Sequence, residues 1–287
     1  MTTVLVPLNI SGFWVPYRGD SYLNTGSVGA SLTLEPPVSF KLTRSSCPLY
    51  LNGVCFEEYH PVARELLRLG ISVHGMSPVP LGVGSAVSGA IAIALAYAYL
   101  HLSEGGELDA GRVGLLAHRI EVETSGGLGD VICQLVGGGL VLRKKPGPPG
   151  IGEVVSIPVR DVEVTLGVLG ERITTKEMLL KFADRFAAAG SRAFTEFTEK
   201  PELEFFLRLS REFSIEVGFA PREVFRRLDE VLRSLSGAVL GYFIKKSLLV
   251  VVHELGLSSA VRSAISRFCQ YSLPPFKPAK RGFTVVS

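Results

Sequence analysis

The chain has 287 residues, a formal net charge of +3, and 47% hydrophobic against 20% charged residues. This length suits two modest domains or one large one, and the apolar share is ample for sizeable cores. The net charge is small and the basic residues are scattered without interleaved aromatic residues, which excludes a nucleic-acid-binding footprint.

The first part of the chain is expected to consist mainly of strands. Residues 3–8 and 29–34 predict short strands, and residues 41–56 predict two strands around the turn Asn52-Gly53. A helix follows over residues 61–70, because proline favours a first helical position and glycine a position just past the last turn. Residues 71–74 then predict a brief strand that leads into a glycine-rich loop.

The cysteines show no pattern typical of a metal site. There is no C-x-x-C spacing among Cys47, Cys55, Cys133 and Cys269. If the strands around Asn52-Gly53 continued in register, Cys47 would lie opposite Glu58 and on the other face of the hairpin from Cys55. We therefore expect free thiols, with no disulfide between Cys47 and Cys55, in a reduced cytoplasm.

One apolar stretch has to be weighed against a membrane span. Residues 75–103 carry no Asp, Glu, Lys or Arg, but prolines and glycines interrupt the first part. The remainder, residues 85–102, is rich in Ala and is short for a span, which needs about 20 predominantly apolar residues. We expect a central helix buried on nearly all sides and no membrane partner. The N-terminal segment lacks the basic region of a signal peptide, which agrees with a cytoplasmic protein.

Helices are expected to dominate the second half. Helices are predicted over residues 110–123, 130–136, 178–188, 202–213, 221–235 and 259–271, and strands over 140–143, 162–169, 248–253 and 282–286. Early strands and late helices give an α+β pattern rather than a regular β-α-β alternation. The shift in composition after Leu169 predicts two domains, residues 1–169 and 170–287.

The glycine-rich loop is a candidate phosphate site. Glycines let the backbone approach a ligand closely, and the free N–H groups of the following helix form an anion site. The spacing fits neither a P-loop nor a dinucleotide-binding fingerprint. An ordinary turn before a buried helix is the alternative. The predicted ATP phosphate-binding residues are Pro80, Gly82, Val83, Gly84, Ser85, Ala86, Val87, Ser88 and Gly89.

Two segments together resemble the GHMP kinases. The loop is similar to their P-x-G-x-G-x-G-x-S segment, with Ala86 where the third glycine is expected. Residues 117–123 (AHRIEVE) and 126–131 (GGLGDV) resemble the A-H-x-x-E-V and G-L-G-D-V segments of the pantoate kinases, a family whose members are archaeal. The resemblance covers residues 4 to 177 in pieces and implies a two-domain GHMP kinase fold with ATP and Mg²⁺ as cofactors.

The resemblance also assigns roles to individual residues. It implies that Asp130 is the catalytic aspartate, and that Glu121 and Ser88 bind Mg²⁺; Glu123 is an alternative metal ligand, and a helix N-cap an alternative role for Asp130. Many GHMP kinases carry a basic residue in the first motif, where this chain has Asn9. The residues expected near the substrate are Ser11, Arg18, Thr25 and Ser27.

Two further groups receive structural interpretations. His118 belongs to the matched helix and is read as packing rather than as a base. Lys245 and Lys246 precede an apolar strand and are read as a solvated charge pair, with phosphate binding as the alternative.

The implied reaction is the phosphorylation of pantoate to 4-phosphopantoate on the route to coenzyme A. The alternatives are another GHMP kinase, of mevalonate or homoserine type, and a non-catalytic ligand-binding protein on the same scaffold. A small-molecule substrate is the expected partner, a homodimer is possible, and neither nucleic acid nor a membrane is expected.

Overall fold

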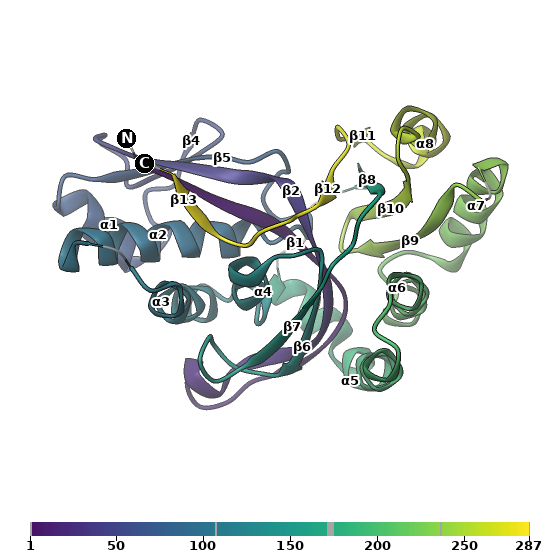
Figure 1. The fold of residues 1–287 in the computed structure, drawn as a ribbon, viewed down its shortest axis with the longest axis horizontal. Helices are drawn as coiled ribbons and strands as arrows, with labels where there is room; N and C mark the ends of the chain where they lie inside the picture. The colour runs from purple at the N-terminus through teal and green to yellow at the C-terminus, as the bar shows by residue number, and fades with distance from the viewer. Residues whose placement is uncertain (1, 107, 171–174, 236, 287) are drawn as a thin grey trace.

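The first of two sheets is built on two long antiparallel strands, β1 (Thr3–Tyr17) and β2 (Gly26–Thr43) (Figure 1). The computed structural model describes residues 2–106, 108–170, 175–235 and 237–286. Within them, the strand order is β13-β1-β2-β5-β3-β4, with β6 and β12 paired to β2, and β7 to β6. The shorter strands are β3 (Leu49–Leu51), β4 (Val54–Cys55), β5 (Ser72–Met76), β6 (Leu140–Lys145), β7 (Glu153–Ile157), β12 (Lys277–Pro278) and β13 (Thr284–Val286).

Four helices belong to this first half: α1 (Pro61–Arg68), α2 (Val87–Glu104), α3 (Ala110–Glu123) and α4 (Asp130–Val136). Helices α2 and α4 pack on β1, and α3 packs on α2. Among the described residues, α2 is the one helix long and apolar enough to cross a membrane. Its side chains from Gly89 to Ala98 are all buried in the protein core, which confirms the expected central helix.

The second sheet has the order β11-β8-β10-β9 and lies beside the first (Figure 1). Its strands are β8 (Val162–Val168), β9 (Val239–Lys245), β10 (Leu248–Glu254) and β11 (Tyr271–Ser272), and its helices are α5 (Thr175–Glu199), α6 (Leu203–Val217), α7 (Arg222–Leu232) and α8 (Ser258–Ile265). Single 3₁₀ turns are η1 (Tyr22–Asn24), η2 (Arg233–Leu235) and η3 (Ser266–Phe268).

Aromatic packing joins the two halves along the second part of β1. Trp14 lies 5.0 Å from Phe186 of α5 and 5.0 Å from Phe213 of α6, measured between ring centroids. Phe13 lies 6.1 Å from Phe206 of α6. All five rings are buried, so α5 and α6 share a core with the first sheet.

The α+β class and most of the expected elements are confirmed. Helices α3 and α4 have the predicted bounds, whereas β1 and β2 extend well beyond the predicted strands, and β7 and β9 were not expected. Strand β8 precedes residue 169 but pairs in the second sheet, and β12 and β13 return to the first. The domain division at residue 169 stays a prediction, and residues 171–174 beside it lie outside the described residues.

The expectation of four free thiols is wrong, because Cys47 and Cys55 form a disulfide. The predicted hairpin pairs are present, Tyr50 with Cys55 and Leu51 with Val54. Strand β3 starts only at Leu49, however, so the chain before Pro48 bends away from the ladder. The alternation of faces therefore does not reach Cys47, and the two Cα atoms lie 6.1 Å apart, within the range for a disulfide. Cys133 and Cys269 are free.

Candidate active site

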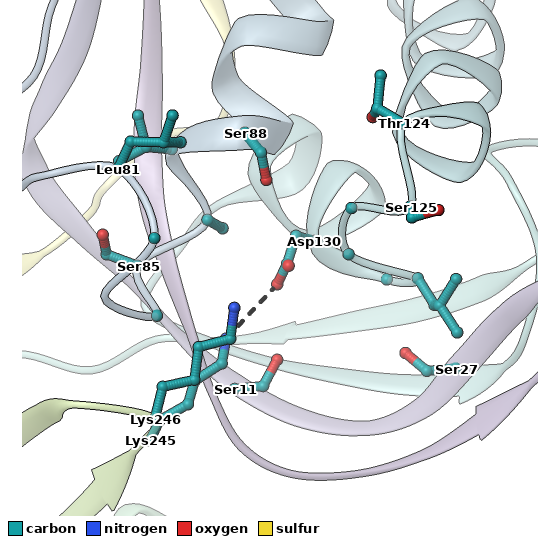
Figure 2. Close-up of a pocket in the computed structure, with 18 of the residues that line it drawn as sticks. Ser11, Ser27, Leu81, Ser85, Ser88, Thr124, Ser125, Asp130, Lys245 and Lys246 are labelled. Atoms are coloured by element: carbon teal, nitrogen blue, oxygen red, sulfur yellow. Dashed lines mark ion pairs between the residues drawn. The ribbon is translucent and has the colours of Figure 1, made fainter. Parts of the chain in front are cut away.

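A cavity of about 450 Å³ lies where the two halves meet (Figure 2). Its walls come from β1 and β2, the segment after β4, the loops before α2 and α4, and the turn between β9 and β10. A cavity with a few convergent polar groups is the default candidate for a binding site. Its lining residues include Ser11, Trp14, Ser27, Ser88, Asp130 and Lys245.

The glycine-rich loop forms one wall and has the backbone that its sequence suggests. Gly82 and Gly84 have positive φ angles of 94° and 121°, which side chains disfavour. A Cβ atom on Gly84 would lie 2.9 Å from the carbonyl oxygen of Lys245, so only glycine fits there. Of the nine predicted phosphate-binding residues, the cavity is lined by Gly82, Gly84, Ser85, Ala86, Val87 and Ser88, and not by Pro80, Val83 and Gly89.

Ala86 stands at the N-cap of α2 in the left-handed conformation, with φ 57° and ψ 35°. An L-residue pays about 1–2 kcal/mol for this conformation, whereas glycine does not. The left-handed backbone at residue 86 therefore explains why the family motif has a glycine at this position. The backbone of Ala86 keeps the glycine-like geometry, and its carbonyl accepts a hydrogen bond of 3.1 Å from the amide of Gln134.

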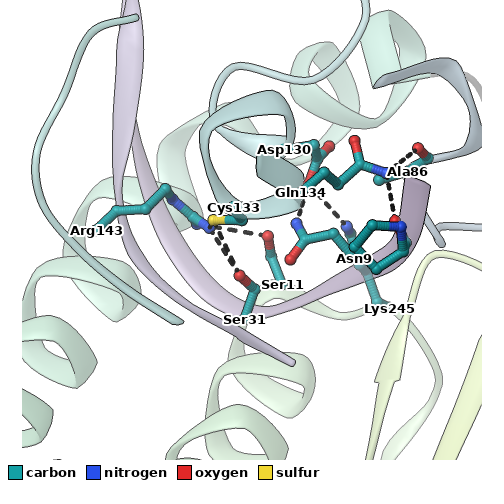
Figure 3. Close-up of polar contacts among 10 residues, drawn as sticks. Asn9, Ser11, Ser31, Ala86, Asp130, Cys133, Gln134, Arg143 and Lys245 are labelled. Carbon is teal, nitrogen blue, oxygen red and sulfur yellow. Dashed lines mark hydrogen bonds and ion pairs between the residues drawn. The ribbon is translucent and has the colours of Figure 1, made fainter. Parts of the chain in front are cut away.

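Asp130 is the first residue of α4, and Gly129 is the N-cap. The carboxylate accepts no capping hydrogen bond from its own helix; instead it accepts one of 2.6 Å from Nδ2 of Asn9 on β1 (Figure 3). Asn9 is thus the residue that orients Asp130. The side chain of Asp130 is 14% exposed and faces the cavity, which an N-cap role alone does not require.

Glu121 lies behind Gly126 and Gly127 and is fully buried. Burial, together with the nearby charge of Asp130, raises the pKa of Glu121 to about 8, although the Ser88 hydroxyl and the Gly127 amide are close enough to oppose the rise. Neither contact reaches hydrogen-bond geometry, so both carboxylate oxygens lack a partner among the described residues.

This arrangement fits Mg²⁺, because a buried carboxylate without donors, next to a hydroxyl and a second carboxylate, favours a hard cation. Among the described residues, no three His, Cys, Asp or Glu side chains gather into a metal set. The alternative ligand Glu123 turns away: its carboxylate pairs with Arg119 at 2.7 Å and with His60 at 2.9 Å.

The interpretation of Lys245 as part of a solvated charge pair is wrong, because its side chain is buried. Its side chain is 7% exposed, and Nζ lies 4.0 Å from Oδ1 of Asp130 and 5.7 Å from the centroid of the Trp14 ring. Burial lowers the pKa of Lys245, and Asp130 opposes this shift. The interpretation failed because β9 was not predicted, so the lysine was assigned to a surface turn instead of to the end of a buried strand.

The predicted substrate residues separate into two groups. Ser11 and Ser27 line the cavity, whereas Arg18 is exposed and Thr25 donates to the carbonyl of Ser21 at 2.8 Å; neither is a lining residue. His118 is buried, and its Nε2 contacts the carbonyls of Tyr22 and Thr25; its packing role stays a prediction.

Arg143 is a functional candidate that the sequence analysis missed. The residue is 1% exposed, and its guanidinium donates to Ser31, to Cys133 and, at 3.4 Å, to Ser11 (Figure 3). Nε has no partner among the described residues. A Cβ atom on Gly129 would lie 2.8 Å from this Nε, so only the glycine backbone separates Arg143 from the cavity wall. An arginine at the end of an apolar strand was the available signal.

Gln134 ties three parts of the site together. Its amide Nε2 donates to the carbonyl of Pro7 at 2.8 Å and to that of Ala86 at 3.1 Å (Figure 3). These bonds connect α4 to β1 and to the glycine-rich loop, so the position of the loop depends on the helix that carries Asp130.

Comparisons with known proteins agree with this geometry. Residues 54–138 match the GHMP kinases N terminal domain. A pantoate kinase of Thermococcus kodakarensis is 30% identical over 270 residues, covering 87% of each chain. A pantoate kinase of Methanocaldococcus jannaschii is 30% identical over 236 residues, covering 77% of this chain and 82% of that protein. A solved phosphotransferase related to the CoA biosynthesis pathway is 26% identical, with a TM-score of 0.78 over 100% of this chain and 99% of that chain. The chain therefore belongs to the GHMP kinase family, in the branch that contains these pantoate kinases.

Proposed function

We propose that this protein is an ATP-dependent pantoate kinase, which transfers the γ-phosphoryl group of ATP to the primary alcohol of pantoate and gives 4-phosphopantoate. The observation that carries the proposal is the place of Asp130, which faces the cavity between the glycine-rich loop and the side chains of Ser11 and Ser27. A proton acceptor between a phosphate loop and a polar acceptor subsite is what a metabolite kinase needs. The relatives named as pantoate kinases support the choice of acceptor.

ATP is proposed to lie with its phosphates along residues 80–89, where backbone N–H groups at the start of α2 favour anions. Mg²⁺ bound with ATP supplies charge neutralisation on the phosphoryl oxygens. Glu121 and Ser88 are its proposed ligands. The support is the buried Glu121 carboxylate, which lacks hydrogen-bond partners among the described residues.

Pantoate is proposed to lie toward Ser11, Ser27 and Arg143. A buried guanidinium beside a cavity wall suits a carboxylate, because arginine stays charged and donates in a planar fork. Arg143 donates a hydrogen bond of 3.4 Å to the hydroxyl oxygen of Ser11. The Ser11 hydroxyl can in turn donate its own hydrogen to the substrate. Arg18 and Thr25 have no comparable support.

In the proposed reaction the alcohol oxygen of pantoate attacks the γ-phosphorus as the bond to the bridging oxygen of ADP breaks. The alcohol proton passes to the Asp130 carboxylate, which Asn9 orients through its 2.6 Å hydrogen bond. The electron pair of the broken bond remains on ADP. General-base assistance of this kind contributes typically about 10²–10⁴ in rate.

A panel of acceptor alcohols tests the proposal. ADP release is measured with ATP and pantoate, mevalonate or homoserine, and pantoate is expected to give the highest kcat/KM. If mevalonate or homoserine is turned over far more efficiently, the substrate assignment is wrong. If no acceptor supports turnover, the protein is a ligand-binding member of the family.

Several narrower expectations stay proposals. They are the cytoplasmic location, the absence of nucleic-acid and membrane partners, a homodimer, and the domain boundary at residue 169. The absence of nucleic-acid and membrane partners is supported by the modest net charge of +3 and by the burial of α2 inside the core.

A further inference from the structure

The turn between β9 and β10 reaches from the second sheet into the cavity. Lys245 ends β9 and pairs with Leu248, the first residue of β10, so the turn is only two residues long. The carbonyl of Lys245 packs against Gly84, close enough that a Cβ there would clash at 2.9 Å. The lysine is therefore fixed beside the phosphate-binding loop by backbone contacts and does not depend on a flexible surface segment.

The surroundings of the Lys245 ammonium group are unusual for a structural lysine. A buried ammonium loses several kcal/mol of hydration, which a close ion pair with good hydrogen bonds has to offset. Nζ lies 4.0 Å from Oδ1 of Asp130, at the outer limit of an ion pair, and that oxygen already accepts from Asn9. The face of Trp14 adds a cation–π contact at 5.7 Å. Neither contact provides short acceptors for the three N–H donors of the ammonium group.

A phosphoryl group would provide those acceptors. Figure 2 shows Lys245 directed toward Asp130 from the side of the cavity that also carries the glycine-rich loop. A γ-phosphoryl group that is to react with an alcohol near Asp130 has to lie between this carboxylate and the loop. A fixed cation at the same place meets the charge that develops during transfer, which is the largest contribution in many enzymes.

We propose that Lys245 is a catalytic residue that binds the transferring phosphoryl group and keeps Asp130 aimed at the acceptor alcohol, an inference that rests on the proposed kinase function. Lys245 acts as a hydrogen-bond donor and gives up no proton in the step. The alcohol oxygen forms the new bond to phosphorus, the bond to the ADP oxygen breaks, and the alcohol proton goes to Asp130.

A nucleotide-affinity comparison tests the phosphoryl contact without any acceptor. Binding of ADP and of the β,γ-methylene analogue of ATP is measured by calorimetry for the wild type, Lys245→Met and Lys41→Met. Lys41 is an exposed lysine on β2 outside the cavity and serves as the matched control. We expect Lys245→Met to weaken the ATP analogue by about tenfold or more, as for a charged hydrogen bond, and ADP by less than about threefold.

Turnover provides the second measurement, with whichever acceptor the wild type uses best. Lys245→Met is expected to lower kcat by about 10²–10³, and a thermal melt checks that the variant is folded. Lys245→Ala, which also serves if the Met variant does not fold, is expected to regain part of its rate with propylammonium, which matches the deleted atoms.

The outcomes separate the two proposals. If mevalonate or homoserine replaces pantoate as the best acceptor, the proposed substrate fails and the role of Lys245 is still decided by the affinity ratio. If Lys245→Met weakens ADP and the ATP analogue equally, or leaves both affinities and kcat within about threefold of the wild type, the role of Lys245 is overturned.

Discussion

At the scale of single residues, the site is organised by two carboxylates of unequal environment. Asp130 accepts a hydrogen bond from Asn9 and lies near the ammonium group of Lys245. Glu121 is fully buried, and the nearby charge of Asp130 further raises its pKa. Both carboxylates approach Gly127, where a Cβ atom would lie 2.1 Å from Asp130 and 2.8 Å from Glu121. Paired carboxylates in different surroundings separate into different roles, and the roles proposed here are a proton acceptor for Asp130 and a metal ligand for Glu121.

Asp130→Asn is expected to lower kcat by about 10²–10⁴ while ATP still binds, because an amide cannot accept the alcohol proton. The replacement keeps the shape and can still accept the hydrogen bond from Asn9. The turnover rate of the variant is measured together with its ATP affinity, by titration, and its stability, by a thermal melt. A folded variant that binds ATP and keeps most of its rate would contradict the catalytic role.

The raised pKa of Glu121 predicts how stability depends on pH in the ligand-free protein. The folded state holds this proton up to about pH 8, whereas the unfolded chain releases it near the ordinary value of 4.5. The folded state therefore binds more protons in this window, and the free energy of unfolding falls as pH rises from about 4.5 to about 8. Glu121→Gln should remove this slope.

Thermal melts of the wild type and Glu121→Gln between pH 5 and pH 8, in a chelator and without nucleotide, check that prediction. We expect the midpoint of the wild type to decline more steeply and the variant to be the more stable of the two at pH 8. Parallel profiles would mean that Glu121 does not titrate in this window.

The sequence predicted some of these residues and not others for a physical reason. Asp130, Glu121 and Ser88 lie in motifs whose spacing is local, so a pattern can find them. Arg143 reaches the site through the pairing of β6 with the distant β2. Lys245 reaches it because the β9–β10 turn packs against Gly84, which is far away in the sequence. Their identity as buried cations depends on what packs over them, which periodicity does not describe.

At the scale of elements, the start of α2 has a residue type that does not suit its backbone conformation. The loop needs a left-handed residue at position 86, and alanine is not suited to that conformation. Hydrogen bonds from Gln134 to Ala86 and Pro7 hold it in place. Tertiary contacts therefore maintain the loop geometry at a position where the family motif has glycine.

Ala86→Gly is expected to leave the free energy of unfolding unchanged or to raise it by about 1 kcal/mol. The gain from relieving the left-handed alanine, about 1–2 kcal/mol, exceeds the entropy cost of glycine, about 0.5–1 kcal/mol. Ala90→Gly, inside the same helix, is the matched control and should lose at least about 1 kcal/mol. Urea unfolding measures both, and equal losses would contradict the argument.

The bounds of helices were predicted correctly where a capping residue or a glycine in the sequence marks the end of the helix. Helix α3 begins after Asp109, whose carboxylate accepts from the amide of Arg112 at 3.0 Å, and α4 ends at Gly137 with a positive φ. Strand β9 was missed because Gly237 lies just before its apolar run and Gly241 interrupts that run. The disulfide was missed because a continuous hairpin register was assumed through Pro48.

At the scale of the whole molecule, β1 connects the two halves. Its first part packs with α2 and α4 beneath the first sheet, and its second part carries Phe13 and Trp14 into the core shared with α5 and α6. This length was not predictable, because Pro7, Gly12 and Pro16 all argue for breaks. A bulge between Ser11 and Phe13 lets the strand continue past Gly12.

Phe206→Ala is expected to lower the free energy of unfolding by about 3–5 kcal/mol, the usual loss for a fully buried phenylalanine. Because the ring contacts Phe13 of β1, both halves should lose stability together and unfolding should remain a single transition. Urea unfolding followed by far-ultraviolet circular dichroism and by calorimetry checks this. Two separated transitions would show that the halves unfold independently.

Trp14 is the only tryptophan in the chain, and it stands where the shared aromatic core, the cavity and Lys245 meet. Indole emission responds to nearby charge and to the polarity around the ring. The protein thus carries an intrinsic optical probe at its reaction centre, and a fluorescence titration of the unmodified chain can follow the arrival of a nucleotide without any attached dye.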